Sequence, residues 1–121
     1  MAETFVNFKQ TVKSGDCYRK IKIYRVSWAS NITYWVHNRS KINSVIVRII
    51  CGPDRKSWQV DGADILVEPG KVQALVPNYF SKYSSLQYKS EATGRPAVLD
   101  IWFQMTRPPA RDCLGVGNDW S

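Results

Sequence analysis

Apolar and polar residues alternate along most of this chain, and the spacing of an amphipathic helix does not recur. The longest example is the segment 97–105, in which every second residue is apolar. Alternation with a period of two is typical of a β-strand that buries one face. Turn-forming clusters separate the alternating segments at spacings of about ten residues. The pattern therefore predicts an all-β protein.

The length of the chain limits it to one domain. A chain of 121 residues can bury one core but is too short for two. We expect a single-domain antiparallel β-sandwich of about eight strands, with a closed barrel as the alternative. The sandwich domain is placed in residues 1–105, and an irregular C-terminal tail in residues 106–121. The tail contains Gly115-Val116-Gly117, which lacks the strand–turn–helix context of a phosphate loop.

The segment 44–51 is the strongest strand, because apolar residues occupy both of its faces. A strand that is apolar on both sides is usually central in its sheet. The apolar phases of this strand and of the segment 97–105 identify the deepest core positions. We expect four side chains to be almost inaccessible to solvent: Val47, Ile49, Leu99 and Ile101.

The alternation shifts phase by one residue between Ile23 and Tyr24. A β-bulge produces such a shift, because one extra residue exchanges the side chains that face the core. On this interpretation Lys20, Lys22 and Arg25 all project into solvent from the same sheet face.

Positive charge is concentrated in the first half of the chain, and the net charge is +7. The stretch from Cys17 to Pro53 holds seven of the 17 basic residues, no acidic residue and five aromatic residues. An excess of one sign favours association with anionic membranes, acidic glycans or nucleic acid. The stretch therefore indicates an anionic or glycan-like partner, or a protein partner.

Aromatic residues are the second feature of the sequence that supports a binding function. By phase, Trp28 and Trp58 are predicted to be buried, whereas Trp35 and Trp102 point away from the core. Exposed Trp and Tyr side chains stack on sugars or unpaired bases, or lie at a membrane surface; the alternative is that another subunit covers them. We predict a ligand- or partner-binding surface made of seven residues: Lys20, Lys22, Arg25, Trp35, Tyr79, Phe80 and Tyr83.

The sequence contains no recognisable catalytic or metal centre, and we expect neither an enzyme nor a cofactor. His37 is the only histidine, and no Gly-x-Ser-x-Gly elbow accompanies it. The four carboxylates between Asp54 and Glu68 do not have the spacing of a calcium-binding loop. The favoured interpretation is that these residues form turns. In particular, Asp61-Gly62 is predicted to form a turn.

The three cysteines, Cys17, Cys51 and Cys113, have no CxxC spacing, which argues against a zinc site. The favoured interpretation is three reduced thiols, with Cys51 buried at a strand end. The alternatives are a Cys17–Cys51 or a Cys51–Cys113 disulfide.

We therefore expect a non-catalytic recognition module that binds a glycan, a membrane headgroup or a protein through a basic and aromatic sheet face. The alternative is a nucleic-acid-binding or viral coat-like β-sandwich. Oligomerisation is compatible with either. The chain begins without a signal peptide, so a soluble protein that is cytoplasmic or exported by another route is expected.

Overall fold

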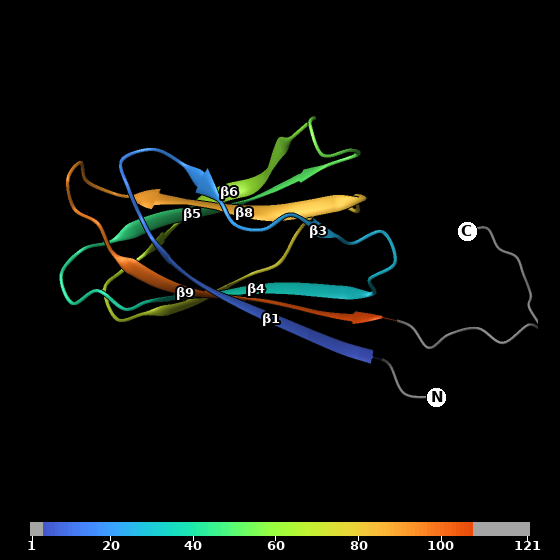
Figure 1. Cartoon of the computed structure of the whole chain (residues 1–121), viewed down its shortest axis with the longest axis horizontal. Coiled ribbons are helices and arrows are strands. Elements are labelled where there is room, and N and C mark those ends of the chain that lie inside the picture. Colours follow the sequence, from blue (N-terminus) through green and yellow to red (C-terminus); the bar gives the residue numbers. More distant parts are fainter. Residues whose placement is uncertain (1–3, 108–121) are drawn as a thin grey trace, which may run out of the picture.

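The computed structural model describes residues 4–107, and these form two antiparallel β-sheets packed face to face (Figure 1). The nine strands are β1 (Thr4–Lys13), β2 (Arg19–Lys20), β3 (Tyr24–Arg25), β4 (Asn31–Asn38), β5 (Val45–Gly52), β6 (Gln59–Val67), β7 (Val72–Leu75), β8 (Tyr83–Ser90) and β9 (Val98–Arg107). No helix occurs in this range, and neither sheet closes on itself. The predicted sandwich is confirmed, and the barrel alternative is wrong.

The four-stranded sheet has the order β1-β9-β4-β7. The second sheet has the order β2-β8-β5-β6, and β3 also pairs with β8. The predicted central strand, β5, lies between β8 and β6, as its two apolar faces indicated. The last strand ends at Arg107, two residues beyond the predicted domain boundary, and the rest of the tail lies outside the described residues.

The core lies between the inner faces of the two sheets. Val47, Ile49, Leu99 and Ile101 are at most 2% exposed, so the predicted core positions are confirmed. Aromatic rings join the two layers: the ring of Tyr24 in β3 stacks on that of Phe103 in β9, with centroids 3.9 Å apart. Such contacts hold the inner faces of the two sheets against each other. Buried side chains pack there as densely as in crystals of small organic molecules.

The predicted phase shift is confirmed by the register of β2 and β3 against β8. Lys20 pairs with Gln87, and Tyr24 pairs with Ser84. Four steps along the chain therefore face three steps along β8, which is the one-residue excess of a bulge.

Two expectations about local structure are wrong. Asp61-Gly62 forms no chain-reversing turn, because β6 continues through both residues; Asp61 pairs with Ile49, and the register with β5 then shifts at Gly62, whose φ is +90°. Trp28 is 39% exposed rather than buried, since β3 ends at Arg25 and the alternation no longer applies beyond it. Trp58, also predicted to be buried, is half-buried.

The described cysteines are free thiols. Cys17 is exposed and Cys51 is buried, so a Cys17–Cys51 disulfide is excluded. The alternative pairing involves Cys113, which lies outside the described residues.

Candidate functional site at one end of the sandwich

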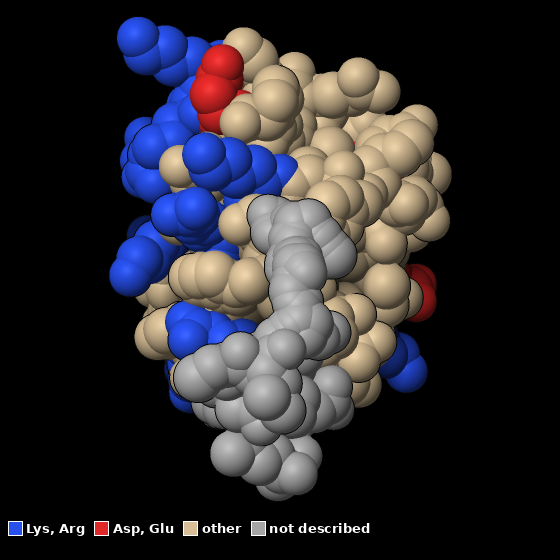
Figure 2. Space-filling model, turned by 90° about the vertical axis from the view of Figure 1, so that its right-hand side faces the viewer, with Lys and Arg blue, Asp and Glu red and all other residues tan. Residues whose placement is uncertain are grey.

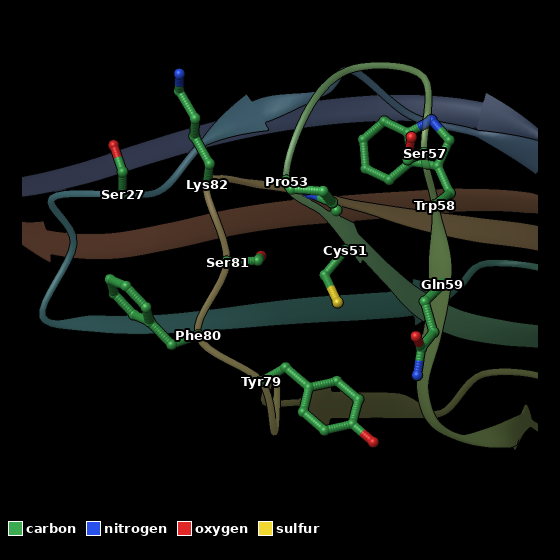
Figure 3. A pocket seen from close by; sticks show the side chains of 11 residues that line it. Ser27, Cys51, Pro53, Ser57, Trp58, Gln59, Tyr79, Phe80, Ser81 and Lys82 are labelled. Carbon is green, nitrogen blue, oxygen red and sulfur yellow. The ribbon is translucent and has the colours of Figure 1, made fainter.

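A pocket of about 880 Å³ opens at one end of the sandwich, between the β5–β6 loop and the segment that precedes β8. In Figure 3, Pro53 and Trp58 face Tyr79 and Phe80 across the opening, and Cys51 lies between them. The remaining lining residues are small or polar: Ser27, Gly52, Ser57, Gln59, Ser81 and Lys82. The pocket thus combines aromatic walls with a few hydrogen-bonding groups, as small-ligand sites generally do.

A buried carboxylate holds one wall of the pocket. Asp61 accepts hydrogen bonds from the backbone N–H of Asn78, at 3.0 and 2.9 Å, and from that of Tyr79, at 3.1 Å. Hydrogen bonds to a charged acceptor are stronger than those between neutral groups. The loop that carries Tyr79 and Phe80 is therefore anchored to β6.

The opposite wall is held within its own loop. Asp54 accepts the backbone N–H groups of Lys56, at 2.8 Å, and Ser57, at 2.6 Å. These two hydrogen bonds stabilise the carboxylate form and lower the pKa of Asp54 below its usual value. Asp54 and Asp61 thus have separate roles, and within residues 4–107 no three or more His, Cys, Asp or Glu side chains are grouped so that they could hold a metal ion.

The aromatic residues of the wall are presented to solvent. Phe80 is 84% exposed and Tyr79 is 54% exposed, although the backbone that bears them is anchored. Exposed aromatic side chains on a fixed backbone lose little conformational entropy when they contact a ligand.

Cations near the pocket lie over aromatic rings, and one of them, Lys82, is part of the pocket lining. The guanidinium of Arg55 and the ammonium of Lys82 lie 5.5 and 5.7 Å from the ring centre of Tyr83. Trp28 lies in the neighbouring β3–β4 loop, and the guanidiniums of Arg25 in β3 and Arg107 at the end of β9 lie 5.6 and 4.2 Å from its ring centre. We call these four cations, Arg25, Arg55, Lys82 and Arg107, the basic rim.

The basic rim is not neutralised by acidic side chains in the part of the chain that the structure describes. The three ion pairs found there involve Asp100 or Asp64 and none of the rim cations. Figure 2, which faces this end of the sandwich, shows Lys and Arg side chains gathered along one side. The rim therefore carries an uncompensated positive field beside the aromatic pocket.

The pocket has no activated nucleophile. Its lining contains neither a histidine nor a carboxylate. Burial, together with the nearby negative charge of Asp61, raises the pKa of the Cys51 thiol. A thiol that stays protonated is a poor nucleophile.

The structure brings together only part of the predicted binding surface. Tyr79 and Phe80 line the pocket, and Arg25 and Tyr83 lie opposite each other at its rim. The remaining three residues, Lys20, Lys22 and Trp35, lie elsewhere.

Lys20 is on the outer face of the five-stranded sheet, opposite Gln87, and Trp35 is on the outer face of the other sheet. The ammonium of Lys22 lies 5.6 Å from the ring centre of Phe8 in β1, across the edge of the sandwich. Lys20 and Arg25 do share one face, because their register partners Gln87 and Tyr83 have the same phase on β8, but the expectation is wrong for Lys22. The residues around the bulge leave the regular ladder, so Lys22 turns toward the other sheet.

Sequence reasoning missed five contributors to the site: Trp28, Arg55, Trp58, Lys82 and Arg107. Trp28 and Trp58 were assigned to the core from alternation, but both lie outside the strands: β3 ends at Arg25, before Trp28, and β6 begins at Gln59, after Trp58. Arg55 and Lys82 lie in loops, where no periodicity shows which way a side chain points. The dense aromatic segment 78–83 was the signal that located this end of the molecule.

The fold and this site define a small antiparallel β-sandwich with a basic and aromatic end. Residues 25–107 match the family described as a domain of unknown function (DUF6385), and the chain belongs to that family. No curated protein matches its sequence.

Three solved structures share the fold at low sequence identity. The exported protein XepA of PBSX has a TM-score of 0.63 and 11% identity, over 96% of this chain but only 43% of that one. PirA has a TM-score of 0.58 and 10% identity, over 80% of this chain and 92% of that one. A Bacillus endospore appendage protein has a TM-score of 0.52 and 12% identity, over 89% and 93%. These similarities show the fold alone. The function has to be inferred from the residues of the site, because one fold can carry many functions.

Proposed function

We propose that this protein is a non-catalytic recognition domain that binds an anionic glycan at the pocket end of the sandwich. The observation that carries the proposal is the aromatic pocket bordered by cations with no acidic partner in the described range.

The aromatic walls suit the sugar rings of such a ligand. A pyranose ring presents C–H groups on its faces, and these pack well on the flat, apolar rings of Trp and Tyr. Trp58, Tyr79 and Phe80 offer such faces around the opening. The hydroxyl of Ser57 and the amide of Gln59 lie beside them and can bond the hydroxyl groups at the edge of the sugar.

The basic rim suits the negative groups. Arg guanidiniums bind carboxylates and sulfates in bidentate fashion, whereas the Lys ammonium acts as a point charge. Arg25, Arg55 and Lys82 supply both kinds of contact close to the aromatic rings. Their long-range field accelerates encounter with a polyanion, and the rings provide contact that survives added salt.

Single-stranded nucleic acid is the second candidate, because cation–aromatic pairs continue along the sandwich edge from Trp28 to Phe8. Stacking platforms beside cations are how many proteins bind unpaired strands. The two ligands differ in salt dependence, since phosphate contacts release condensed counterions and make affinity fall steeply with salt.

The test is to measure affinity for a carboxylated polysaccharide (polygalacturonate), a neutral one (dextran) and a single-stranded oligodeoxynucleotide, each at low and high salt. The proposal expects binding of polygalacturonate that weakens but persists at high salt, and no binding of dextran at the pocket end. Binding of the oligodeoxynucleotide alone, with loss at high salt, would replace the glycan by nucleic acid as the ligand.

Assembly of several copies also stays a proposal. The similar fold of a protein whose structure is described as forming disulfide-linked pili supports it, together with the exposed thiol of Cys17. Sedimentation with and without reductant tests it, and a monomer under both conditions would exclude disulfide-linked assembly.

A further inference from the structure

A second hollow lies beside the pocket at the same end of the sandwich. Tyr79, Phe80 and Ser81 line both cavities, so this segment is a ridge between them. The second hollow has a volume of about 360 Å³. Its other lining residues come mainly from the β3–β4 loop, the first residues of β4 and the segment that follows β7. Three segments that are distant in sequence therefore extend the site beyond the pocket.

The ridge is anchored on both sides of Phe80. The carboxylate of Asp61 accepts the backbone N–H of Tyr79 at 3.1 Å, and the hydroxyl of Ser81 donates to the carbonyl oxygen of Tyr83 at 2.8 Å. Between these two hydrogen bonds the side chain of Phe80 is 84% exposed. Figure 3 shows its ring at the side of the pocket away from Trp58. A ring in this position, on a backbone that is already fixed, can contact a ligand that extends into both cavities.

The second hollow differs from the pocket in its chemistry. Its lining includes the hydroxyl or amide side chains of Asn31, Thr33 and Asn78, together with the apolar side chains of Ile32 and Val76. No Lys, Arg, Asp or Glu is among the described residues that line it. Hydroxyl and amide groups both donate and accept hydrogen bonds, as the hydroxyl groups of a sugar do. The second hollow therefore suits the hydroxyl groups of a glycan, whereas the basic rim suits its carboxylates.

The size of the two cavities suits more than one sugar unit. Small-ligand pockets span about 300–1,000 Å³. The pocket, at about 880 Å³, is near the upper end of this range, and the second hollow adds about 360 Å³. Because Phe80 is mostly exposed, the ridge leaves the path from one cavity to the other open to a ligand at the surface. A short ligand would fill one cavity, whereas a continuous chain can occupy both.

We infer that the pocket and the second hollow together bind an internal stretch of a long anionic glycan, which passes from one to the other over Phe80. The sugar in the pocket stacks on Trp58 and Tyr79, and the basic rim binds its carboxylate. The following sugars cross the ring of Phe80 and bond their hydroxyl groups to Asn31 and Thr33. This inference rests on the proposed function and adds the ligand class to it: long linear chains, and not chain ends or short oligosaccharides.

The experiment measures the affinity of the whole chain and of two single-charge variants for digalacturonate and octagalacturonate. Val76→Glu places a carboxylate at the second hollow, where it repels an anionic chain. Val72→Glu is the matched control, because Val72 begins β7 and lines neither cavity, whereas Val76 directly follows β7. The two valines are similarly exposed, at 56% and 62%, and both variants change the net charge equally. Circular dichroism verifies that each variant is folded.

The effect of Val76→Glu should depend on the length of the ligand. It should weaken octagalacturonate binding about tenfold or more and digalacturonate binding less than about threefold, because only the longer chain reaches the second hollow. Val72→Glu should change either affinity less than about threefold. The comparison between the variants decides the matter, because a longer chain gains some affinity simply by offering more sugar units to one site. Equal weakening of octagalacturonate by the two variants, or equal weakening of both ligands by Val76→Glu, overturns the inference and leaves the proposed function standing.

Backbone amide resonances of the unsubstituted chain give a second measurement that does not depend on the variants. The resonances of Asn31 and Thr33 should shift with octagalacturonate and not with digalacturonate, whereas those of Trp58 and Gln59 should shift with both ligands. Shifts that are confined to the pocket residues at both lengths overturn this inference alone. If neither ligand binds, the proposed function and this inference both fail.

Discussion

Both carboxylate oxygens of Asp61 accept the backbone N–H of Asn78, at 3.0 and 2.9 Å, and this joins β6 to the loop that forms one wall of the pocket. The carboxylate is buried and also accepts the N–H of Tyr79. Removing it would leave the partly buried backbone N–H groups of Asn78 and Tyr79 without this acceptor.

Asp61→Asn is expected to cost about 1–3 kcal/mol of unfolding free energy, because the amide replaces an acceptor by a donor that faces N–H groups. Urea unfolding measures this change. Asp64→Asn on the same strand is the control: its ion pair with Arg48 is half exposed, at 3.9 Å, so its loss should cost less than about 1 kcal/mol. Equal effects of the two substitutions would show that Asp61 does not anchor the loop.

The second prediction concerns the core. Ile49→Ala in β5 should destabilise the fold by about 2–5 kcal/mol, from lost transfer energy and the cavity that remains. Ile49 is 2% exposed at the centre of the five-stranded sheet. A loss of less than about 1 kcal/mol in urea unfolding would place β5 at the periphery instead.

Stability should decline in alkaline solution. Burial raises the pKa of Tyr34, whose hydroxyl also contacts the Ser84 hydroxyl at 2.8 Å, and burial raises those of Tyr24 and Tyr88 as well. Below about pH 10 both folded and unfolded states keep the phenol protons, so these groups leave stability unchanged. Above it the unfolded chain ionises first and binds fewer protons, so the unfolding free energy falls as pH rises.

Urea unfolding at a series of pH values measures that decline, and the phenol absorbance follows ionisation in parallel. Tyr34→Phe should reduce the slope above about pH 10, since it removes one of the shifted groups. Complete ionisation of all tyrosines in a chain that remains folded would contradict the burial of Tyr34.

The exposed loop should contribute to binding without contributing to stability. Phe80→Ala and Tyr79→Ala remove rings that are mostly in solvent, so unfolding should change by less than about 0.5 kcal/mol. The affinity for polygalacturonate at high salt should fall severalfold, because screening leaves ring contact as the main attraction. Unchanged affinity in both variants would remove the loop from the site.

The parts of the fold that depend on local pattern could be predicted from the sequence. Period two identified the strands, the two apolar faces of β5 placed it centrally, and the phase change at Tyr24 located the bulge. Each of these follows from which side of one strand a residue occupies.

The binding surface depends on pairing between distant segments, which alternation does not encode. β1 pairs with β9, so residues as far apart as Thr4 and Arg107 are neighbours. Trp35 and Lys20 were placed together because both are exposed, although they belong to different sheets. At Asp61-Gly62 the local signal produced an irregularity in the ladder with β5 and not the end of the strand, because the pairing resumes at Ile65.

The most direct test of the proposed function compares two triple charge reversals of equal size. The first replaces Arg25, Arg55 and Lys82 of the basic rim by Glu. The second replaces Lys41, Lys71 and Arg95 by Glu; these exposed residues lie in the loops at the opposite end of the sandwich. Both variants change the net charge equally, so non-specific attraction falls by the same amount.

The measured quantity is the dissociation constant for polygalacturonate at low salt, with circular dichroism verifying the fold of both variants. The rim reversal should weaken binding about tenfold or more, while the opposite-end reversal should change it less than about threefold. Equal weakening by the two variants would show that net charge, and not the pocket end, attracts the glycan, and would contradict the proposed site.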